Sequence, residues 1–295
     1  IKILKDNNCN PSFLVGGIYK EENISYKYTS SKYFVIEGDE YDTAFFDKRS
    51  KFFHYKPDTL IINNLEYDHS DIFENLEQIQ KQFHYLIRTM SGNTSIIYNK
   101  GDKNISSLLS MGCWSKKTAS RKFSNIANII GDHNLQNASS AVSAAKTIGI
   151  NESKSILALE KFSGVKRRLE LIDNKNFILY DDFAHHPTAI AATLNAVKNR
   201  HPGKKITTIF EVRSNSMVSG SHKDNFYSSF DLTDELYIYC TKDARWLKDS
   251  GDFLVYQDIS VIIDKIYSST ENVDVVILMS NGDTSHIIKK LNKYE

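Results

Sequence analysis

Two short apolar runs, each ending in a cluster of acidic residues, constrain the fold of this chain most. The first run, 33–36, leads into Glu37–Asp42, and the second, 59–62, leads into the acidic segment 63–71. Short β-branched and aromatic runs between polar residues predict buried strands. In open α/β sheets, ligands bind just beyond the carboxyl ends of the strands. We therefore predict a ligand site at one edge of an α/β sheet, and we expect both strands to belong to that sheet.

The rest of the chain alternates predicted strands with predicted helices, which favours an α/β fold with a mostly parallel sheet flanked by helices. A basic joint with a glycine, 162–168, interrupts the alternation. We predict a central domain over 1–166 and a smaller Rossmann-like domain over 167–295. Further strands are expected at 94–98, 177–181, 205–210, 235–240 and 273–279. Helices are expected at 75–90, 131–149, 152–161, 187–200, 222–230, 258–268 and 283–292.

The composition excludes several classes of protein. A chain of 295 residues is long enough for about two domains. Its net charge of +1 gives no general electrostatic basis for binding nucleic acid or an anionic membrane. No apolar stretch approaches the roughly 18 residues of a spanning helix. The 3 cysteines are widely separated, which argues against a zinc knuckle or a disulfide framework. We expect a soluble protein of the reducing cytoplasm.

Glu37 and His69 are the candidate metal ligands. Several carboxylates within a few residues repel one another unless a cation or a basic group lies beside them. Oxygen ligands with one imidazole suit a hard divalent cation such as Mg²⁺. Asp68 or Asp71 would orient the imidazole of His69. A solvated acidic turn and an exposed histidine are the alternatives that this pattern leaves open.

Polar residues at the start of an Ala-rich helix form a second candidate site. The side chains of His133, Asn134 and Asn137 could hold a purine ring. The simpler alternative is that Asp132 or Asn134 is the N-cap of this helix. The pattern alone does not decide between a nucleotide contact and a cap.

The basic joint and the turn that follows the next strand are further candidates. Arg167 or Arg168 could bind a phosphate with bidentate geometry, although a basic triplet is more often a solvated surface. Asp182 and His185 lie at a strand-to-helix turn, where a nucleotide is commonly bound. Pro187 suits the first position of the helix that follows. Zinc is disfavoured here, because adjacent histidines cannot easily face one ion.

The loop after the predicted strand 205–210 is the last candidate. Arg213, with its neighbours Ser214 and Asn215, could bind a carboxylate-bearing substrate, and a plain polar loop is equally compatible with the spacing. No GxxxxGK[ST] and no GxGxxG occurs in the chain, so the usual glycine-rich phosphate cradle is missing from it.

Taken in order, these segments resemble the Mur ligase family, the ATP-dependent amide-forming enzymes of bacterial cell-wall synthesis. The stretch 36–52 and the loop 211–217 are similar to the branch that joins UDP-N-acetylmuramate to the recycled tripeptide L-alanyl-γ-D-glutamyl-meso-diaminopimelate. The branch that adds L-alanine is also similar in the His-Asn and His-His-Pro-Thr segments, but it tends to differ over 41–52. The resemblance implies that ATP phosphorylates the muramate carboxylate and that the peptide amine then attacks the acyl phosphate.

The resemblance also implies a role for each candidate residue. Two Mg²⁺ ions would be bound by Glu37 and His69, and the adenine side of ATP would be bound by His133, Asn134 and Asn137. Nucleotide phosphate would be bound by Arg168 or Arg167. The loop that closes over ATP and excludes water would contain Asp182 and His185. The incoming peptide would face Arg213, Ser214 and Asn215.

The resemblance corresponds to about the last two-thirds of a family member. Family members carry an N-terminal domain for the UDP-sugar and then a P-loop, and Ile1–Asn10 resembles the end of the helix after that loop. We therefore expect a truncated central domain, with little or no ligase activity from this chain alone. We also expect an open sheet edge that favours self-association. The alternative from another class is a split or degenerate ligase that only binds a nucleotide or a peptide.

Overall fold

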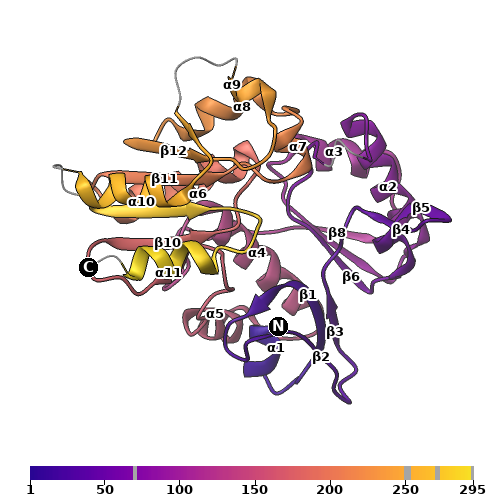
Figure 1. The fold of residues 1–295 in the computed structure, drawn as a ribbon. Helices are drawn as coiled ribbons and strands as arrows, with labels where there is room; N and C mark the ends of the chain where they lie inside the picture. The colour runs from indigo at the N-terminus through magenta and orange to yellow at the C-terminus, as the bar shows by residue number, and fades with distance from the viewer. Residues whose placement is uncertain (69–71, 249–253, 270–272, 294–295) are drawn as a thin grey trace. The chain divides into compact units, whose positions relative to one another are not determined.

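The computed structural model describes residues 1–68, 72–248, 254–269 and 273–293 (Figure 1). The chain divides into two compact units, Ile1–Ser163 and Gly164–Glu295, here called unit 1 and unit 2. The sequence placed the boundary after residue 166, within the same basic joint. Each unit combines strands and helices around its own apolar core, which confirms the predicted α/β class. Among the described residues, no helix is long and apolar enough to cross a membrane.

The described residues of unit 1 form two three-stranded sheets and one hairpin. The first sheet has the order β2-β1-β3, with β1 antiparallel to β2 and parallel to β3. The second sheet, β6-β7-β8, is entirely parallel, and β4 pairs with β5 as a hairpin. The strands are β1 (Ser12–Tyr19), β2 (Ile24–Lys27), β3 (Phe34–Ile36), β4 (Asp42–Ala44), β5 (Asp47–Ser50), β6 (Thr59–Ile62), β7 (Ser95–Tyr98) and β8 (Lys116–Ala119). The helices are α1 (Lys2–Asp6), the 3-10 helix η1 (Lys51–His54), α2 (Leu76–Thr89), α3 (Lys103–Ser110), α4 (Asp132–Thr147) and α5 (Glu152–Glu160).

The parallel sheet β6-β7-β8 carries the larger core of unit 1. Ile96 of β7 is fully buried in a cluster with Ile79 and Ile87 of α2 and Ile105 of α3. The helix α4 contacts β6 and β7, and a second cluster joins α4 to α1 and α5. Full burial of each such isoleucine contributes roughly 1.5–3 kcal/mol. The predicted strands 59–63 and 94–98 and the predicted helix 75–90 are confirmed.

The prediction that both acidic segments follow strands of one sheet is wrong. Within the described residues, β3 pairs with β1 and β6 pairs with β7, in two separate sheets. The sequence did not predict β1, because Gly16 and Gly17 interrupt its apolar run. It also missed the β4–β5 hairpin, which begins at Asp42, the last residue of the first acidic segment. Both β3 and β6 are edge strands of their described sheets, and self-association through such an edge stays a prediction.

In unit 2, the strands in the described part of the chain form one six-stranded sheet with the order β13-β12-β11-β14-β10-β9. All neighbouring strands are parallel except β9, which is antiparallel to β10. The strands are β9 (Glu170–Ile172), β10 (Ile178–Asp182), β11 (Ile206–Glu211), β12 (Glu235–Tyr239), β13 (Val255–Tyr256) and β14 (Val275–Met279). The helices are α6 (Pro187–Arg200), α7 (Asn215–Val218), α8 (Lys223–Phe226), the 3-10 helix η2 (Tyr227–Phe230), α9 (Arg245–Lys248), α10 (Ile259–Ser268) and α11 (Ser285–Lys293).

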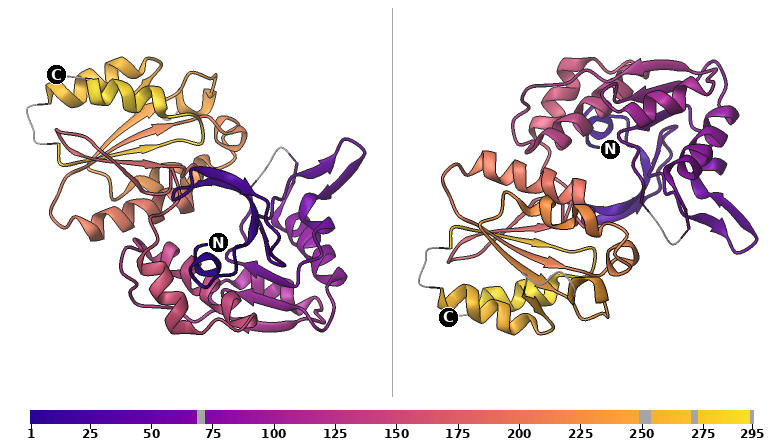
Figure 2. Two further views of the ribbon diagram at one scale, coloured as in Figure 1. Left: turned by 90° about the horizontal axis from the view of Figure 1, so that it is seen from below. Right: turned by 90° about the horizontal axis from the view of Figure 1, so that it is seen from above.

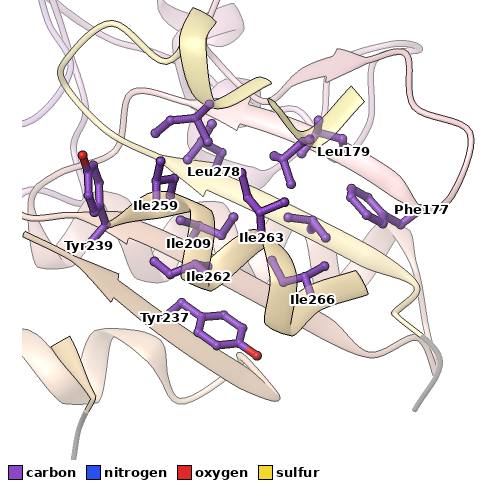
Figure 3. Close-up of a cluster of buried hydrophobic side chains, with 13 residues drawn as sticks. Phe177, Leu179, Ile209, Tyr237, Tyr239, Ile259, Ile262, Ile263, Ile266 and Leu278 are labelled. Carbon is purple, nitrogen blue, oxygen red and sulfur yellow. The ribbon is translucent and has the colours of Figure 1, made fainter. Parts of the chain in front are cut away.

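Helices cover both faces of the unit 2 sheet. Figure 2 shows α10 and α11 on one face and α6 on the other. Figure 3 shows Ile262 and Ile263 of α10 packed against Ile209 of β11 and Leu278 of β14, all of them buried. This doubly wound arrangement confirms the predicted Rossmann-like second half. Because β10, β11, β12 and β14 are parallel, their carboxyl ends lie at one edge of the sheet, and this edge carries the polar residues described next.

Candidate functional site

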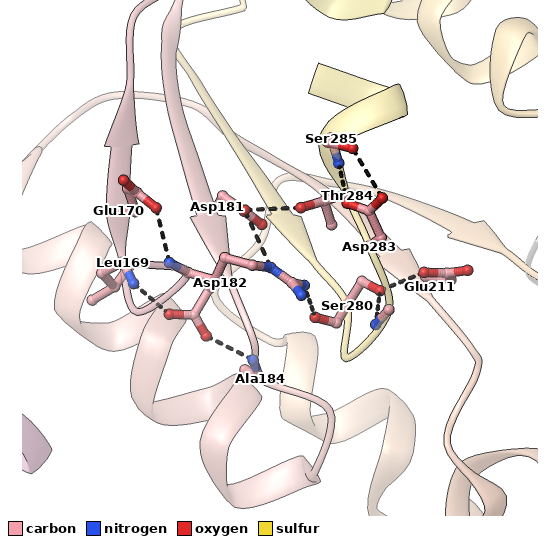
Figure 4. A network of polar contacts seen from close by, with 12 residues as sticks. Leu169, Glu170, Asp181, Asp182, Ala184, Glu211, Ser280, Asp283, Thr284 and Ser285 are labelled. Carbon is pink, nitrogen blue, oxygen red and sulfur yellow. Dashed lines mark hydrogen bonds and ion pairs between the residues drawn. The ribbon is translucent and has the colours of Figure 1, made fainter. Parts of the chain in front are cut away.

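A buried polar network lies at the carboxyl edge of the unit 2 sheet (Figure 4). Asp181 of β10 is 2% exposed and accepts a hydrogen bond of 2.8 Å from the hydroxyl of Thr284. Its Oδ2 also lies 3.3 Å from Nε of Arg167, whose guanidinium donates to the carbonyl oxygen of Ser280. Burial raises the pKa of Asp181, although the Thr284 hydroxyl and the Arg167 charge act in the opposite direction. Arg167 is therefore held within unit 2 by the ends of two neighbouring strands.

Asp182 uses both of its carboxylate oxygens within unit 2. Oδ2 accepts the N–H of Leu169 at 2.6 Å, and Oδ1 accepts the N–H of Ala184 at 2.8 Å and the hydroxyl of Thr193 at 3.2 Å. Burial raises the pKa of Asp182, and the two backbone N–H groups partly oppose that rise. Asp182 thus fixes the basic joint to the turn that precedes α6, a structural role that sequence reasoning missed.

The two arginines of the joint have different surroundings. Arg167 and Leu169 have φ angles of 60° and 48°, in the left-handed region that is costly for residues other than glycine. The contacts of Arg167 and Asp182 described above hold this strained segment in place. Arg168, between Arg167 and Leu169 in the sequence, is exposed. Its guanidinium lies 5.2 Å from the ring centre of Phe183. Between the two arginines, Arg168 is the one with a guanidinium accessible to a phosphate.

The turn after β10 also fixes two histidines. Nδ1 of His185 lies 3.0 Å from the carbonyl oxygen of Phe183, to which it donates in the tautomer protonated at Nδ1. His186 is the N-cap of α6, and its Nδ1 accepts the N–H of Thr188 at 3.3 Å. Pro187 is the first residue of α6, which confirms the predicted helix start. The carboxylate and the two histidines of this turn therefore each contact backbone atoms within unit 2.

In unit 1, Glu37 follows β3 and is exposed. Its Oε2 accepts the N–H of Gly16 at 2.5 Å, and a Cβ atom at Gly16 would lie only 3.2 Å from the same oxygen. Lysines offset part of the acidic charge nearby, since Lys51 pairs with Asp39 at 3.1 Å and Lys48 pairs with Asp42 at 2.6 Å. The sequence argument allowed a cation or a basic group for this purpose but named no lysine. It missed the lysines because β5 and η1 bring them back to the acidic segment.

The described residues fit an open metal site, completed by waters and substrate phosphates, better than a closed cage of protein ligands. His69 lies outside the described residues, so its role as a metal ligand stays a prediction. Within 1–68, 72–248, 254–269 and 273–293, no group of three or more His, Cys, Asp and Glu residues could hold a metal ion. Mg²⁺ usually keeps several waters and is bound by one or two carboxylates together with substrate phosphates. Glu37, with one oxygen held by backbone, fits such an open site rather than a closed protein cage.

The predicted adenine-side residues lie in the first turns of α4. The N-cap of α4 is Gly131, with a φ of 88°, so the simpler alternative, in which Asp132 or Asn134 is the N-cap, is wrong. The side-chain amide of Asn134 instead donates to the carbonyl oxygen of Ile130 at 2.8 Å. His133 and Asn137 are four positions apart and share one helix face. Their proposed contact with a purine stays a prediction.

The predicted peptide-binding residues follow β11. Arg213 is half-exposed, and its Nη1 lies 3.5 Å from Oε1 of Glu211, whose side chain is almost fully buried. The ammonium of Lys242 donates to the carbonyl oxygen of Arg213 at 2.7 Å. Ser214 is the N-cap of α7, and Asn215 is the first residue of this helix. Sequence reasoning missed Glu211 as a partner, although its place at the end of a buried strand was a usable signal.

The buried Asp181 leads to a prediction about pH. Its folded-state pKa is raised from 3.8, so the stability that it contributes is fully present below the unfolded pKa and is lost as pH rises through the folded pKa. Acidification from pH 7 to pH 4 is therefore expected to stabilise the wild type relative to Asp181→Asn. Thermal unfolding of both proteins across this range measures the difference.

Asp283→Asn is the matched control for this measurement. The backbone N–H of Ser285, and then its hydroxyl, donate hydrogen bonds that lower the pKa of the exposed Asp283. The contribution of Asp283 to stability is therefore lost only as pH falls below about 3.8. The difference between the wild type and Asp283→Asn should stay nearly constant from pH 7 to pH 4. A difference for Asp181→Asn that also stays constant would show that its pKa is not raised.

Comparison with known proteins places these features in a family. Residues 23–125 match the Mur ligase middle domain, and residues 167–282 match the Mur ligase, glutamate ligase domain. The chain is 37% identical to UDP-N-acetylmuramate–L-alanyl-γ-D-glutamyl-meso-2,6-diaminoheptandioate ligase of Escherichia coli (strain K12), across 98% of this chain and 70% of that protein. It is 27% identical to the UDP-N-acetylmuramate–L-alanine ligase of Caldicellulosiruptor saccharolyticus, across 97% of this chain and 71% of that protein.

A solved structure agrees with the sequence comparison. The crystal structure of a murein peptide ligase from Psychrobacter arcticus 273-4 matches with a TM-score of 0.73 and 31% identity, over 98% of this chain and 72% of that one. The two domain matches, the curated relatives and this structure agree. The chain belongs to the Mur ligase family, whose members are ATP-dependent ligases.

Proposed function

We propose that this chain acts in an ATP-dependent ligase that joins UDP-N-acetylmuramate to the tripeptide L-alanyl-γ-D-glutamyl-meso-diaminopimelate in peptidoglycan recycling. The observation that carries the proposal is the 37% identity to the Escherichia coli ligase named for this reaction, over 98% of the chain. The relative named for the addition of L-alanine is 27% identical over a similar share. Transfer of L-alanine is therefore the second candidate.

The proposed reaction has two steps. The γ-phosphoryl group of ATP passes to the muramate carboxylate and gives an acyl phosphate, with ADP as the leaving group. The free amine of the tripeptide then attacks the carbonyl carbon, phosphate leaves, and an amide bond forms. Mg²⁺, when bound, offsets the charge of the ATP phosphates.

Each proposed residue has a task in this scheme. The exposed guanidinium of Arg168 donates hydrogen bonds to phosphate oxygens, where negative charge develops during transfer. Glu37 would supply a carboxylate oxygen to one Mg²⁺ ion, and His69 would supply a nitrogen to another. The adenine side and the loop beside the nucleotide are assigned to His133, Asn134, Asn137 and His185. Asp182 keeps this loop and the arginine joint together, which is supported by its three hydrogen bonds.

Arg213 is the proposed contact for a carboxylate of the tripeptide. Its guanidinium is half-exposed, and its one ion pair with a described residue, at 3.5 Å from Glu211, is longer than a hydrogen bond. Most of its five N–H donors are therefore available to a substrate carboxylate. Ser214 and Asn215 complete this polar loop at the start of α7.

Substrate choice tests the proposal. ATP, Mg²⁺ and UDP-N-acetylmuramate are supplied with either the tripeptide or L-alanine, and the amide product is detected by mass spectrometry. Two proteins are compared: this chain, and a fusion that joins it to the part of the Escherichia coli relative that it does not cover. We expect the fusion to ligate the tripeptide roughly a hundredfold faster than L-alanine, because a site built for a polar substrate rejects one that lacks the matching groups.

Each other outcome has a distinct meaning. Faster ligation of L-alanine by the fusion would replace the proposed substrate with the second candidate. Binding of ATP or the tripeptide without product from the fusion would favour the non-catalytic fragment. We expect little product from the chain alone, and efficient tripeptide ligation by the chain would contradict that expectation.

A further inference from the structure

Gly282, in the loop between β14 and α11, is the starting point of the inference. This residue is buried, and its N–H donates to the hydroxyl of Ser280 at 2.8 Å. Its φ lies outside the left-handed region, so its backbone conformation does not itself require glycine. The reason for a glycine therefore lies in the neighbouring atoms that a side chain at position 282 would contact.

The side chain of Arg213 occupies the space beside Gly282. A Cβ atom added to Gly282 would lie 2.6 Å from Cδ, 2.8 Å from Nε and 3.0 Å from Cζ of Arg213. Carbon atoms in van der Waals contact are about 3.5–4.0 Å apart, so even alanine would overlap with the arginine. Because the overlapping atoms belong to the far end of a flexible side chain, the arginine would move and the backbone would stay.

The loop and Glu211 together define where Arg213 lies. Figure 4 shows Ser280 and Glu211 pointing toward one another, and the Ser280 hydroxyl donates to Oε2 of Glu211. The other carboxylate oxygen of Glu211, Oε1, lies 3.5 Å from Nη1 of Arg213. The same hydroxyl of Ser280 accepts the N–H of Gly282, so it links the glycine to the partner of the arginine.

We propose that Gly282 is a positioning residue for Arg213. The missing side chain lets the arginine lie across the loop after β14, with its guanidinium beside Glu211 and half-exposed for a peptide carboxylate. This inference rests on the proposed function, because it takes Arg213 as the contact for the tripeptide. Holding the guanidinium in advance reduces the entropic cost of ordering this side chain when the tripeptide binds.

A structural measurement on this chain tests the positioning without any substrate. The Nε–Hε resonance of Arg213 is observed by NMR and assigned through its disappearance in Arg213→Lys. We expect Gly282→Ala to shift this resonance while leaving the unfolding temperature within about 2 °C of the wild type. The matched control is Gly92→Ala, because a Cβ atom there would lie at an ordinary 3.7 Å from the carbonyl oxygen of Trp114. An unchanged resonance in Gly282→Ala would overturn the proposal.

The second part of the test is binding of the tripeptide to this chain and its variants, measured by calorimetric titration. We expect affinity to fall about fivefold in Gly282→Ala and roughly thirtyfold in Arg213→Ala, which loses charge-assisted hydrogen bonds. The double variant should bind as weakly as Arg213→Ala alone, because the glycine acts through the arginine. A double variant that binds clearly more weakly than Arg213→Ala would overturn the proposal. A shifted resonance with unchanged affinity in both single variants would support the positioning and refute the peptide-binding role of Arg213.

Discussion

Replacement of Arg168 by alanine is expected to slow tripeptide ligation by the fusion protein about a thousandfold while leaving its unfolding temperature unchanged. Arginine donors at a transferring phosphoryl group are commonly worth 10³-fold or more in rate. The side chain is exposed and contacts the ring of Phe183, so its removal disturbs little of the packing. Initial rates of amide formation and thermal unfolding of the same samples measure the two effects. Arg168→Lys should be intermediate, because an ammonium keeps the charge but lacks the bidentate fork.

Arg167→Ala is the matched variant. We expect it to lower the stability of unit 2, whereas Arg168→Ala lowers the ligation rate. Removal of this guanidinium leaves the buried Asp181 without its opposite charge and the carbonyl oxygen of Ser280 without a donor. Loss of one partner from such a pair costs about 2 kcal/mol or more, so unit 2 should unfold at a clearly lower temperature. A variant of Arg168 that unfolds as early as Arg167→Ala, with its ligation rate preserved, would contradict the assignment.

The two arginines illustrate what the sequence could not decide. Adjacent basic residues at a joint between two α/β units are visible in the sequence, and either could serve a phosphate. The choice depends on Ser280, whose carbonyl oxygen is brought to Arg167 by the pairing of β10 with β14. Contacts between residues so far apart in the chain follow from strand order, which the apolar pattern of a single strand does not contain.

Strands with a strong apolar pattern of their own were predicted, and strands without such a pattern were missed. The long apolar strands of unit 2 were predicted because central strands of a parallel sheet are buried on both faces. β1, with two glycines, and β8, whose sequence is Lys-Lys-Thr-Ala, lack that signal and were missed. Because the missed strand β1 pairs with β3, while β6 pairs with β7, the two acidic segments follow separate described sheets, and the expectation of one common sheet failed at this point.

The candidate site shows a similar limit. The carboxylates of the first acidic segment were found by composition alone, but the groups that hold them were not. Gly16 lies 21 positions before Glu37 and reaches it through the pairing of β1 with β3. The contact made by Gly282 was also not visible in the sequence, because a glycine in an Asn-Gly turn is expected for its backbone conformation alone. In the structure, both glycines instead lie in close contact with the side chain of a candidate site residue, Gly16 with Glu37 and Gly282 with Arg213.

Glu37→Ala is expected to lower the ligation rate of the fusion about a thousandfold and to raise the Mg²⁺ concentration at which the rate reaches half its maximum. The carboxylate is exposed, and Gly16 holds one of its oxygens, so the other oxygen is the one that would bind Mg²⁺. Loss of this anionic ligand weakens the binding of the ion that offsets charge on the phosphates. Rates measured across a series of Mg²⁺ concentrations separate weaker metal binding from a slower reaction at saturation.

Two further variants decide whether the effect belongs to Glu37 or to the acidic segment as a whole. Asp42→Asn removes a carboxylate that is already paired with Lys48, so we expect a nearly normal rate and Mg²⁺ requirement. Gly16→Ala keeps the carboxylate but places a Cβ atom 3.2 Å from its Oε2. This crowding should displace Glu37 and lower the rate about tenfold, with a raised Mg²⁺ requirement. Equal losses in Asp42→Asn and Glu37→Ala would show that the segment acts through its summed charge, and the assignment of Glu37 as a specific ligand would be wrong.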